Sequence, residues 1–457
     1  MKDKHNRSSR LRWGGLILLA ALWGALLWVA YRPSPYAQQQ NEAFAFSRVL
    51  QVVVIQRWGA RESPDWLTRA LFLRDETLLR EVLRVFDSAE KSGTLVASTR
   101  PSWGLVLHLL GDAAKAQSAL SYDPVDESGR KQKDLVESIL ENRPIGADLQ
   151  SWVQARYEGG TSELPEWHYL AVVAEDEQVR SWLQERGRIM IRRGLVADLL
   201  MWTLLLIALG FGIRFLVHRK TMPASPVHRR FVRAWSSRKV VREFLFASIL
   251  GISGAILVAP IPASAGYYAE SVVLSGFFVL VCPAIWLLFR LTPGWTAALR
   301  IGGLTKHPWS KSSLANLAGV GLLLIALFAY LSFRMFPAGY RMSDLIRADA
   351  LDSHFQVIWI FCLACVIAPL CEEWIYRGVL FGALAEKWGP GFAAVGSSLI
   401  FSTLHFYSWR GGIDIFFVGL AFCWIYRRSG SLWPGIMVHA AYNLILTTQT
   451  AAWFSLH

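Results

Sequence analysis

Long apolar runs alternate with shorter polar segments along most of the chain. A transmembrane helix needs about 20 largely apolar residues. Runs of roughly that length lie at 13–31, 195–217, 244–262, 271–289, 313–335, 355–386, 390–408, 412–427 and 433–453. The pattern predicts an all-α fold, a polytopic transmembrane helix bundle with a small extramembrane α-helical domain inserted after the first span.

The first apolar run follows a basic start that contains Lys2, Lys4 and Arg7. It resembles the beginning of a signal peptide, but its apolar core is longer than such a signal needs, and no clear small-x-small cleavage site follows. We therefore expect 1–31 to be an uncleaved N-terminal membrane anchor.

Residues 32–194 are too long for a loop and too polar to cross a membrane. Within them, apolar residues recur at spacings of three and four over 64–91, and 102–120 shows a similar pattern, which predicts helices. Neither His108 nor His168 has carboxylate or cysteine neighbours at metal-binding spacing, so both are interpreted as structural or surface histidines. We predict an extramembrane helical domain without a catalytic motif.

The composition and charge support a membrane protein. Of the 457 residues, 53% are hydrophobic and 18% are charged, against about 25% charged in soluble domains. These values exclude a disordered chain and an ordinary soluble enzyme. The net charge is +13, yet 32–186 holds 18 Lys and Arg against 23 Asp and Glu, a net of −5. The positive excess thus lies at the N-terminus and between apolar runs, which argues against a nucleic-acid partner.

The distribution of Lys and Arg also predicts an orientation. Segment 1–12 has five such residues and 218–243 has eight, whereas 263–270 has none. Because cytoplasmic loops are enriched in positive charge, the N-terminus is expected in the cytoplasm, and 195–350 is expected to hold spans joined by basic cytoplasmic loops. The basic loops would face an anionic lipid surface. We expect a multi-pass protein of a bacterial inner or plasma membrane, with 32–194 on the other side, available to an extracytoplasmic partner.

The cysteines give no sign of a disulfide framework. Cys362 and Cys365 have a C-x-x-C spacing, but no second pair accompanies them and both lie in an apolar run, so packing is the preferred interpretation. All five lie in apolar runs: Cys282, Cys362, Cys365, Cys371 and Cys423.

Ionisable residues are concentrated in the last apolar runs, where each is a functional hypothesis because burying it is costly. Glu373 and Arg377 are four residues apart on a helix and are predicted to pair. Glu372 is turned by about 100° from Glu373 and has no partner on its own face, which leaves its carboxylate available as a general base. For this Glu-Glu dipeptide alone, a solvated structural pair is the favoured alternative.

His405 is the next candidate. The Lys-Trp-Gly-Pro-Gly sequence at 387–391 predicts a turn. Glu372 lies 17 residues before Gly389 and His405 lies 16 after it. A helical hairpin would therefore return the carboxylate and the imidazole to nearly the same depth, although a lone histidine in a helix is more often a packing residue.

His439 and Asn443 form the third candidate. Pro434 suits the first turn of a helix, which places the two side chains on one face, where they can bind a metal or an oxyanion. The alternative is an interhelical hydrogen-bonded pair. His439 lies only five residues after Pro434, whereas His405 is expected deep in a helix over 390–408. Spacing alone does not bring the two histidines together.

Three motifs occur in order on successive apolar helices: Glu-Glu-x-x-x-Arg at 372–377, Phe-x-x-x-His at 401–405 and His-x-x-x-Asn at 439–443. Together they resemble the CPBP family, the CAAX prenyl endopeptidases and bacteriocin-processing (Abi) intramembrane proteases. The resemblance covers about 355–450, and it assigns 351–457 to the intramembrane catalytic helices.

The resemblance implies an intramembrane endopeptidase, a hydrolase acting on membrane-associated proteins or peptides. Glu372 with His405 would activate the attacking water. His439 and Asn443 would stabilise the oxyanion, and Glu373 with Arg377 would brace the site.

The resemblance leaves the cofactor open, because members have been described both as metalloproteases and as glutamate-dependent proteases. A zincin-type site is excluded, since His-Glu-x-x-His is missing. Glu372, His405 and His439 would offer three ligands to Zn or another divalent metal, but a ligating Glu372 is no longer free as the base. We favour water activated by Glu372.

Two other functions compete with a protease. The first is a non-catalytic membrane scaffold, or a bacteriocin self-immunity protein of the same fold. The second is a transporter or channel with Glu372 in a proton relay, which is disfavoured because the sequence shows no second, matching half with interrupted helices.

Overall fold

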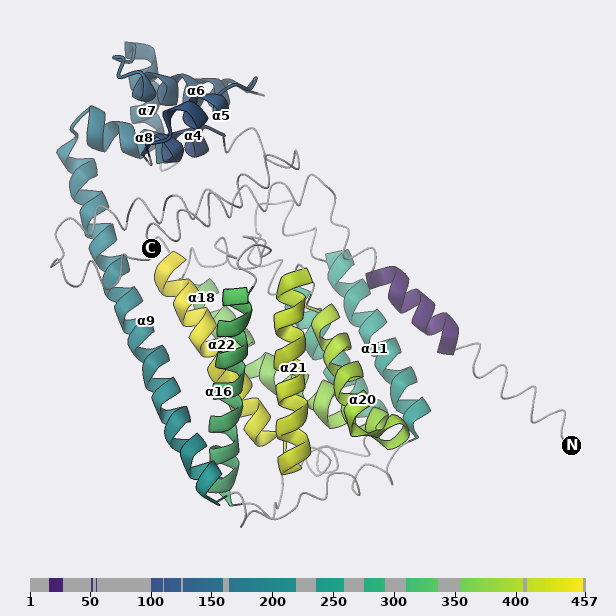
Figure 1. Ribbon diagram of the computed structural model, residues 1–457. Helices are drawn as coiled ribbons and strands as arrows, with labels where there is room; N and C mark the ends of the chain where they lie inside the picture. Colours follow the sequence, from purple (N-terminus) through teal and green to yellow (C-terminus); the bar gives the residue numbers. More distant parts are fainter. Residues whose placement is uncertain are drawn as a thin grey trace, which may run out of the picture. The chain divides into compact units, whose positions relative to one another are not determined.

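The computed structural model describes residues 16–27, 51, 55, 100–109, 111–124, 126–158, 164–218, 236–258, 275–291, 310–335, 354–405 and 409–454. All regular structure in these ranges is helical, which confirms the predicted all-α fold (Figure 1). The predicted helix over 64–91 lies outside the described residues, as do most of the basic stretch 218–243 and the segment 263–270.

The chain divides into two compact units. The first comprises Met1–Pro33, Ala197–Tyr340 and Asp349–Gln449. The second comprises Ser34–Val196, Arg341–Ala348 and Thr450–His457.

The second unit is built from short helices around an apolar core. The fully buried side chains of Trp103, Leu105 and Leu135 lie in this core. The helices are α4 (Arg100–Leu109), α5 (Ala113–Ala119), α6 (Glu127–Leu140), α7 (Ala147–Glu158), α8 (Leu164–His168), η2 (Tyr169–Val173) and the start of α9 (Glu177–His218).

Local signals explain where these helices begin. Asp112 accepts a hydrogen bond from the backbone N–H of Lys115, and Asp126 accepts one from Gly129. Such bonds satisfy backbone donors that the first turn leaves without partners. Between α4 and α5, Gly111 adopts φ +82, so the periodic segment 102–120 forms two helices.

Four of the described helices are long and apolar enough to cross a membrane: Glu177–His218, Ser237–Val258, Lys311–Leu331 and Val357–Thr403. Leu16–Leu27 and Phe277–Leu291 are shorter apolar helices within predicted spans. The protein is therefore a membrane protein in contact with a lipid bilayer.

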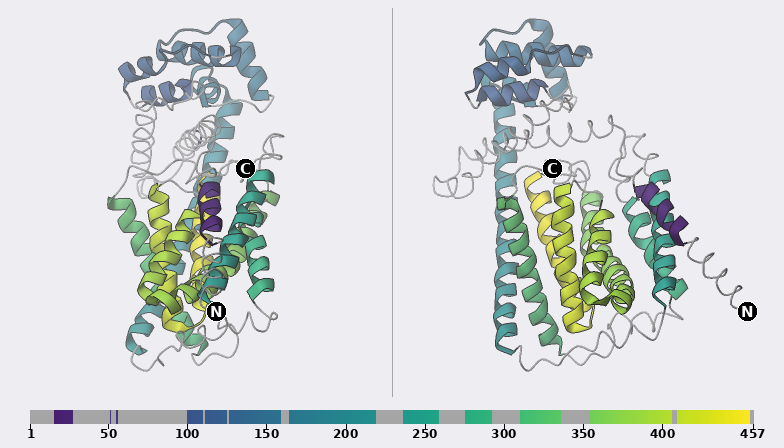
Figure 2. Two further views of the ribbon diagram at one scale, coloured as in Figure 1. Left: turned by 90° about the vertical axis from the view of Figure 1, so that its right-hand side faces the viewer. Right: turned by 45° about the vertical axis from the view of Figure 1, so that its right-hand side comes forward.

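The helices of the first unit pack closely where small residues allow it. They include α11 (Ser237–Val258), η3 (Phe277–Val281), α14 (Cys282–Leu291) and α16 (Lys311–Met335), followed by α21 (Trp409–Ser429) and α22 (Trp433–Phe454). Helix α16 packs on α21, and Figure 2 shows the helices of this unit from two further sides. A Cβ atom on Gly319 would lie 2.7 Å from the carbonyl oxygen of Ala208, so α9 and α16 approach to backbone contact.

The chain from 354 to 403 is helical except at Gly389, and it contains two π-helical segments. It consists of α18 (His354–Cys362), η5 (Leu363–Ile367), α19 (Ala368–Glu372), η6 (Glu373–Phe381) and α20 (Gly382–Thr403). π-helical segments are rare in proteins as a whole, and those that occur are often found at functional sites. Inside α20, Gly389 takes φ 79 and ψ 161, a kink at the turn that 387–391 predicts.

The connection between α21 and α22 is a buried turn. The Ser429 hydroxyl donates to the carbonyl of Ile425 at 2.9 Å and accepts from the N–H of Ser431 at 3.1 Å. Gly430 supplies the left-handed conformation, with φ 72, and its N–H donates to the carbonyl of Tyr426. Because Ser429 and Ser431 are fully buried, α22 begins inside the bundle.

Candidate active site

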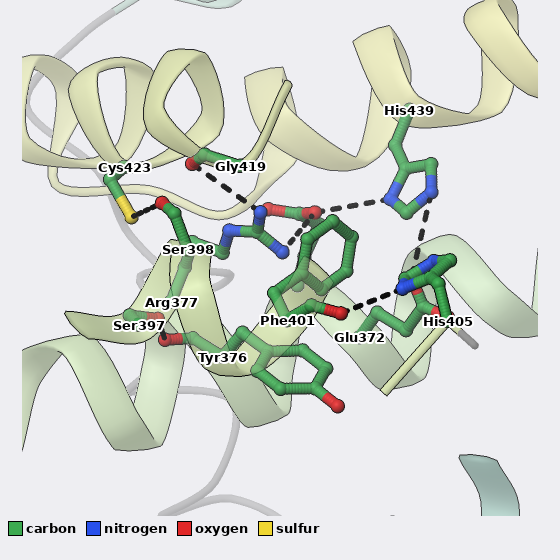
Figure 3. Close-up of polar contacts among 11 residues, drawn as sticks. Glu372, Tyr376, Arg377, Ser397, Ser398, Phe401, His405, Gly419, Cys423 and His439 are labelled. Carbon is green, nitrogen blue, oxygen red and sulfur yellow. Dashed lines mark hydrogen bonds and ion pairs between the residues drawn. The ribbon is translucent and has the colours of Figure 1, made fainter. Parts of the chain in front are cut away.

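Three predicted side chains converge in the first unit (Figure 3). The Oε2 atom of Glu372, at the end of α19, lies 4.0 Å from Nε2 of His405 and 3.7 Å from Nε2 of His439. The side chains of Glu372 and His439 are 7% and 6% exposed, and that of His405 is 22% exposed. The cluster is thus buried, and its accessible side is at His405.

The helix ends explain how the two histidines meet. Helix α20 ends at Thr403, so the expectation that His405 lies deep in a helix over 390–408 is wrong. His405 instead lies in the turn beyond α20, with its N–H bonded to the carbonyl of Ser402. On the other side, the buried turn before α22 starts that helix inside the bundle, which brings His439 to the depth of Glu372.

The second ring nitrogen of each histidine faces a hydrogen-bond acceptor. Nδ1 of His405 lies 2.7 Å from the carbonyl oxygen of Phe401, and Nδ1 of His439 lies 3.1 Å from Oε1 of Glu373. A carbonyl or carboxylate oxygen accepts, so Nδ1 carries the proton in each ring. In the neutral rings, both Nε2 atoms therefore direct a lone pair towards the Glu372 cluster.

These contacts make the cluster rich in acceptors. Among the described residues, Oε2 of Glu372 has no hydrogen-bond partner. Oε2 of Glu372 and the Nε2 lone pair of His439 thus face each other at 3.7 Å, and Nε2 of His405 lies 4.0 Å from the same oxygen. Such an arrangement suits a guest that brings hydrogens or positive charge, such as a water molecule that donates to two of the three atoms.

Glu373 and Arg377 form the predicted pair, with 3.1 Å between Oε1 and Nη1. Arg377 is fully buried, and its Nη2 donates to the carbonyl of Gly419 on α21 at 3.4 Å. Since Oε1 of Glu373 is also the acceptor of His439, a single carboxylate oxygen joins the guanidinium to the imidazole. Sequence spacing predicts the first of these contacts and misses the second.

Two aromatic rings flank the guanidinium. The Arg377 Cζ atom lies 4.2 Å from the ring centroid of Phe401 and 4.8 Å from that of Phe422. Sequence reasoning noted Phe401 within a motif, but it missed Phe422 and the close approach at Gly419, because neither is polar. Gly419 and Ala421, small residues among larger apolar ones on α21, are the sequence signal for that approach.

Asn443 makes a contact that spacing does not suggest. Its Nδ2 donates to the carbonyl oxygen of Ala364, in η5, at 2.7 Å. The N–H of Ala368 bonds to the carbonyl of Leu363, a five-residue step that would pair Ala364 with residue 369. That residue is Pro369, which has no N–H, so Asn443 satisfies a carbonyl that the π-helical pattern leaves without a donor.

No group of three His, Cys, Asp or Glu side chains that could hold a metal ion is present among the described residues.

The sequence comparison covers the same helices. Residues 354–445 match the family described as type II CAAX prenyl endopeptidase Rce1-like, a match that includes Glu372, His405, His439 and Asn443. This part of the chain is similar to that family, which confirms the CPBP resemblance of the three motifs.

Two curated relatives are similar to parts of this chain. The "Putative membrane peptidase YdiL" of Bacillus subtilis is 30% identical over 171 residues, which cover 36% of this chain and 66% of the relative. The UPF0177 protein YbdI of Lactococcus lactis is 25% identical over 131 residues, 28% of this chain and 69% of the relative. No solved structure matches the chain.

Proposed function

We propose that the protein is an intramembrane endopeptidase that hydrolyses peptide bonds of membrane-associated proteins or peptides with water activated by Glu372. The observation that carries this proposal is the buried Oε2 of Glu372, which faces two imidazole Nε2 atoms at 4.0 and 3.7 Å. The family match and the name of the Bacillus subtilis relative support it.

In this mechanism, a water molecule held by the cluster donates one hydrogen to Glu372 and another to a histidine. Glu372 removes a proton as the water oxygen attacks the carbonyl carbon of the scissile bond. The carbon–nitrogen bond then breaks, and the proton passes to the leaving amine. His405, the more exposed histidine, lies where a substrate would enter.

Stabilisation of the oxyanion is assigned to His439 and Asn443. Because Nδ1 of His439 donates to Glu373, its Nε2 can donate only when the ring carries a second proton. Glu372, Glu373 and Arg377 sum to a formal charge of −1, so a proton that the neutral His439 takes up during the reaction makes the buried cluster neutral. The Asn443 amide has two hydrogens, of which the contact with Ala364 uses one.

A divalent metal held by Glu372, His405 and His439 is the alternative proposal. It would act as a Lewis acid on the scissile carbonyl. No step above depends on it. Metal analysis of the purified protein distinguishes the two, since one bound metal per chain that is lost in His439→Gln would support the alternative.

We also propose that the N-terminus lies in the cytoplasm of a bacterial cell and that 32–194 lies outside, where it recruits a partner or substrate. The distribution of Lys and Arg supports this orientation. Two exposed serines provide a matched test, Ser118 in α5 and Ser312 in α16. A membrane-impermeant thiol reagent added to intact cells should label Ser118→Cys and not Ser312→Cys, and the reverse result would overturn the orientation.

The decisive experiment compares protein termini in membranes by mass spectrometry. Cells would carry the wild-type protein, Glu372→Gln or Glu386→Gln at equal abundance, where Glu386 is an exposed glutamate of α20 that serves as the control. A protease predicts specific termini in the wild type and the control that disappear with Glu372→Gln. Identical termini in all three strains, with folded protein, would instead favour the scaffold or self-immunity function.

A further inference from the structure

We propose that Phe422 is a positioning residue of the active site, which holds the imidazole of His439 in the plane that its bond to Glu373 requires. This inference rests on the proposed function, because it assigns His439 a part in catalysis. Phe422 lies on α21, outside the three sequence motifs.

The contacts of Phe422 connect the two charged parts of the site. Its ring is stacked on the imidazole of His439, with centroids 4.9 Å apart and planes inclined by 26°. The Cζ atom of Arg377 lies 4.8 Å from the centroid of the same ring. Phe422 is fully buried, so its ring is confined by its neighbours and offers a fixed face to both.

His439 needs such a face because its own side chain does not fix the ring plane. The terminal torsion of histidine is broad, so rotation would move Nδ1 away from Oε1 of Glu373. A flat ring 4.9 Å away opposes that rotation, whereas an aliphatic side chain does not. With Nδ1 held on Glu373, Nε2 remains directed at Glu372, 3.7 Å away.

Phe401 provides a parallel within the same site. Its ring contacts Arg377 at 4.2 Å and meets the imidazole of His405 edge-on at 4.5 Å. Phe401 also meets the imidazole of His439 edge-on at 6.3 Å, so each aromatic ring joins the guanidinium to a histidine, and the ring stacked on His439 is that of Phe422. Only Phe401 is visible in a motif, as part of Phe-x-x-x-His.

Replacement of Phe422 by leucine keeps the site apolar and removes the flat face. We expect a fall in kcat of about 10- to 100-fold, the size expected when catalytic groups are displaced by about 1 Å. KM should change little, because the ring is buried behind His439. A matched control is Phe381→Leu, since Phe381 is equally buried but packs edge-on against Tyr426 at 6.1 Å.

The test uses the full chain in lipid nanodiscs with nitrogen-15 histidine, and the His439 signals are assigned from their loss in His439→Gln. We expect the Nδ1-protonated form of His439 in the wild type and in Phe381→Leu, and a mixture of forms in Phe422→Leu. If Phe422→Leu does not fold, Phe422→Met serves the same purpose. An unchanged His439 spectrum in the folded variant would overturn the proposal.

This readout does not depend on catalysis, so it separates the proposal from the proposed function. Cleavage is measured in parallel on a peptide that spans a terminus lost with Glu372→Gln. A selective fall in kcat with Phe422→Leu supports the positioning role, and equal falls with Phe381→Leu overturn it. If only the proposed function is wrong, the wild-type protein will show no cleavage and will still give the expected His439 spectrum.

Discussion

Nδ1 of His439 lies 3.1 Å from Oε1 of Glu373, a contact that joins α22 to η6 in the first unit. The same oxygen pairs with Arg377. Glu373 therefore neutralises the charge of Arg377 and fixes the orientation of the His439 ring. The Oε2 atom of neighbouring Glu372 has no hydrogen bond among the described residues. This division of roles leads to the first prediction.

Glu373→Gln should destabilise the protein far more than Glu372→Gln. The first change leaves the fully buried Arg377 without its counter-charge, which costs about 3–5 kcal/mol. The second removes no hydrogen bond of the described residues at Oε2, so a change below about 1 kcal/mol is expected. Unfolding in mixed detergent micelles measures both, and equal losses would contradict the division of roles.

Gly419→Ala should loosen the contact between α20 and α21. The new Cβ would lie 2.9 Å from Cβ and 3.2 Å from Cα of Ser398, so the helices must separate, at a cost of about 1–3 kcal/mol. Arg377 should lose its bond to the carbonyl of residue 419. Gly396→Ala is the matched control, because its Cβ meets only the flexible end of Leu384 at 3.6 Å.

The melting temperature of each variant in detergent tests this prediction. A lower value for Gly419→Ala, with Gly396→Ala close to the wild type, is expected. Similar melting temperatures for the two variants would show that the helices tolerate the added methyl group.

Asn443→Ala should leave the carbonyl of Ala364 without a donor, which costs about 1–3 kcal/mol. Pro369→Ala should compensate, since it supplies an N–H at the residue that the five-residue pattern pairs with Ala364. A double-mutant cycle of unfolding free energies measures the coupling. Strictly additive effects would show that Pro369 is not the reason why that carbonyl needs Asn443.

The second unit offers a pH prediction at Tyr122. Burial raises the pKa of its hydroxyl to about 12, an increase that Arg100 opposes and that Asp126 and Glu137 reinforce. In the unfolded chain the hydroxyl titrates near 10, so above that pH the unfolded state binds fewer protons and stability falls until about pH 12.

The tyrosinate absorbance of the wild type minus that of Tyr122→Phe gives the titration of this one residue in the full chain. A midpoint near 12 is expected. A midpoint near the ordinary value of about 10 would contradict the burial of this hydroxyl.

Local features of the site are readable from the sequence, and long-range ones are not. The Glu373–Arg377 pair follows from helical spacing, and the kink at Gly389 follows from Gly-Pro-Gly. The depth of His439 depends on the buried turn before α22, whose position is set by packing. The partner of Asn443 depends on a π-helical segment on another helix, which helical periodicity does not predict.

The contact of Phe422 with His439 is another long-range feature that the sequence does not predict. In an apolar run, a phenylalanine that faces lipid and one that stacks on an imidazole look identical. Only the fold tells them apart, because the pairing joins residues 17 positions apart on two helices.

The buried turn at 429–431 also bears on the order in which the protein is made. That turn lies inside the bundle, and α22 is synthesised after α21. A nascent chain that ends before Trp433 already has Glu372 and His405 but lacks His439. The acceptor cluster is therefore completed only when α22 has been added, so a shorter chain would have the carboxylate and one imidazole without the second.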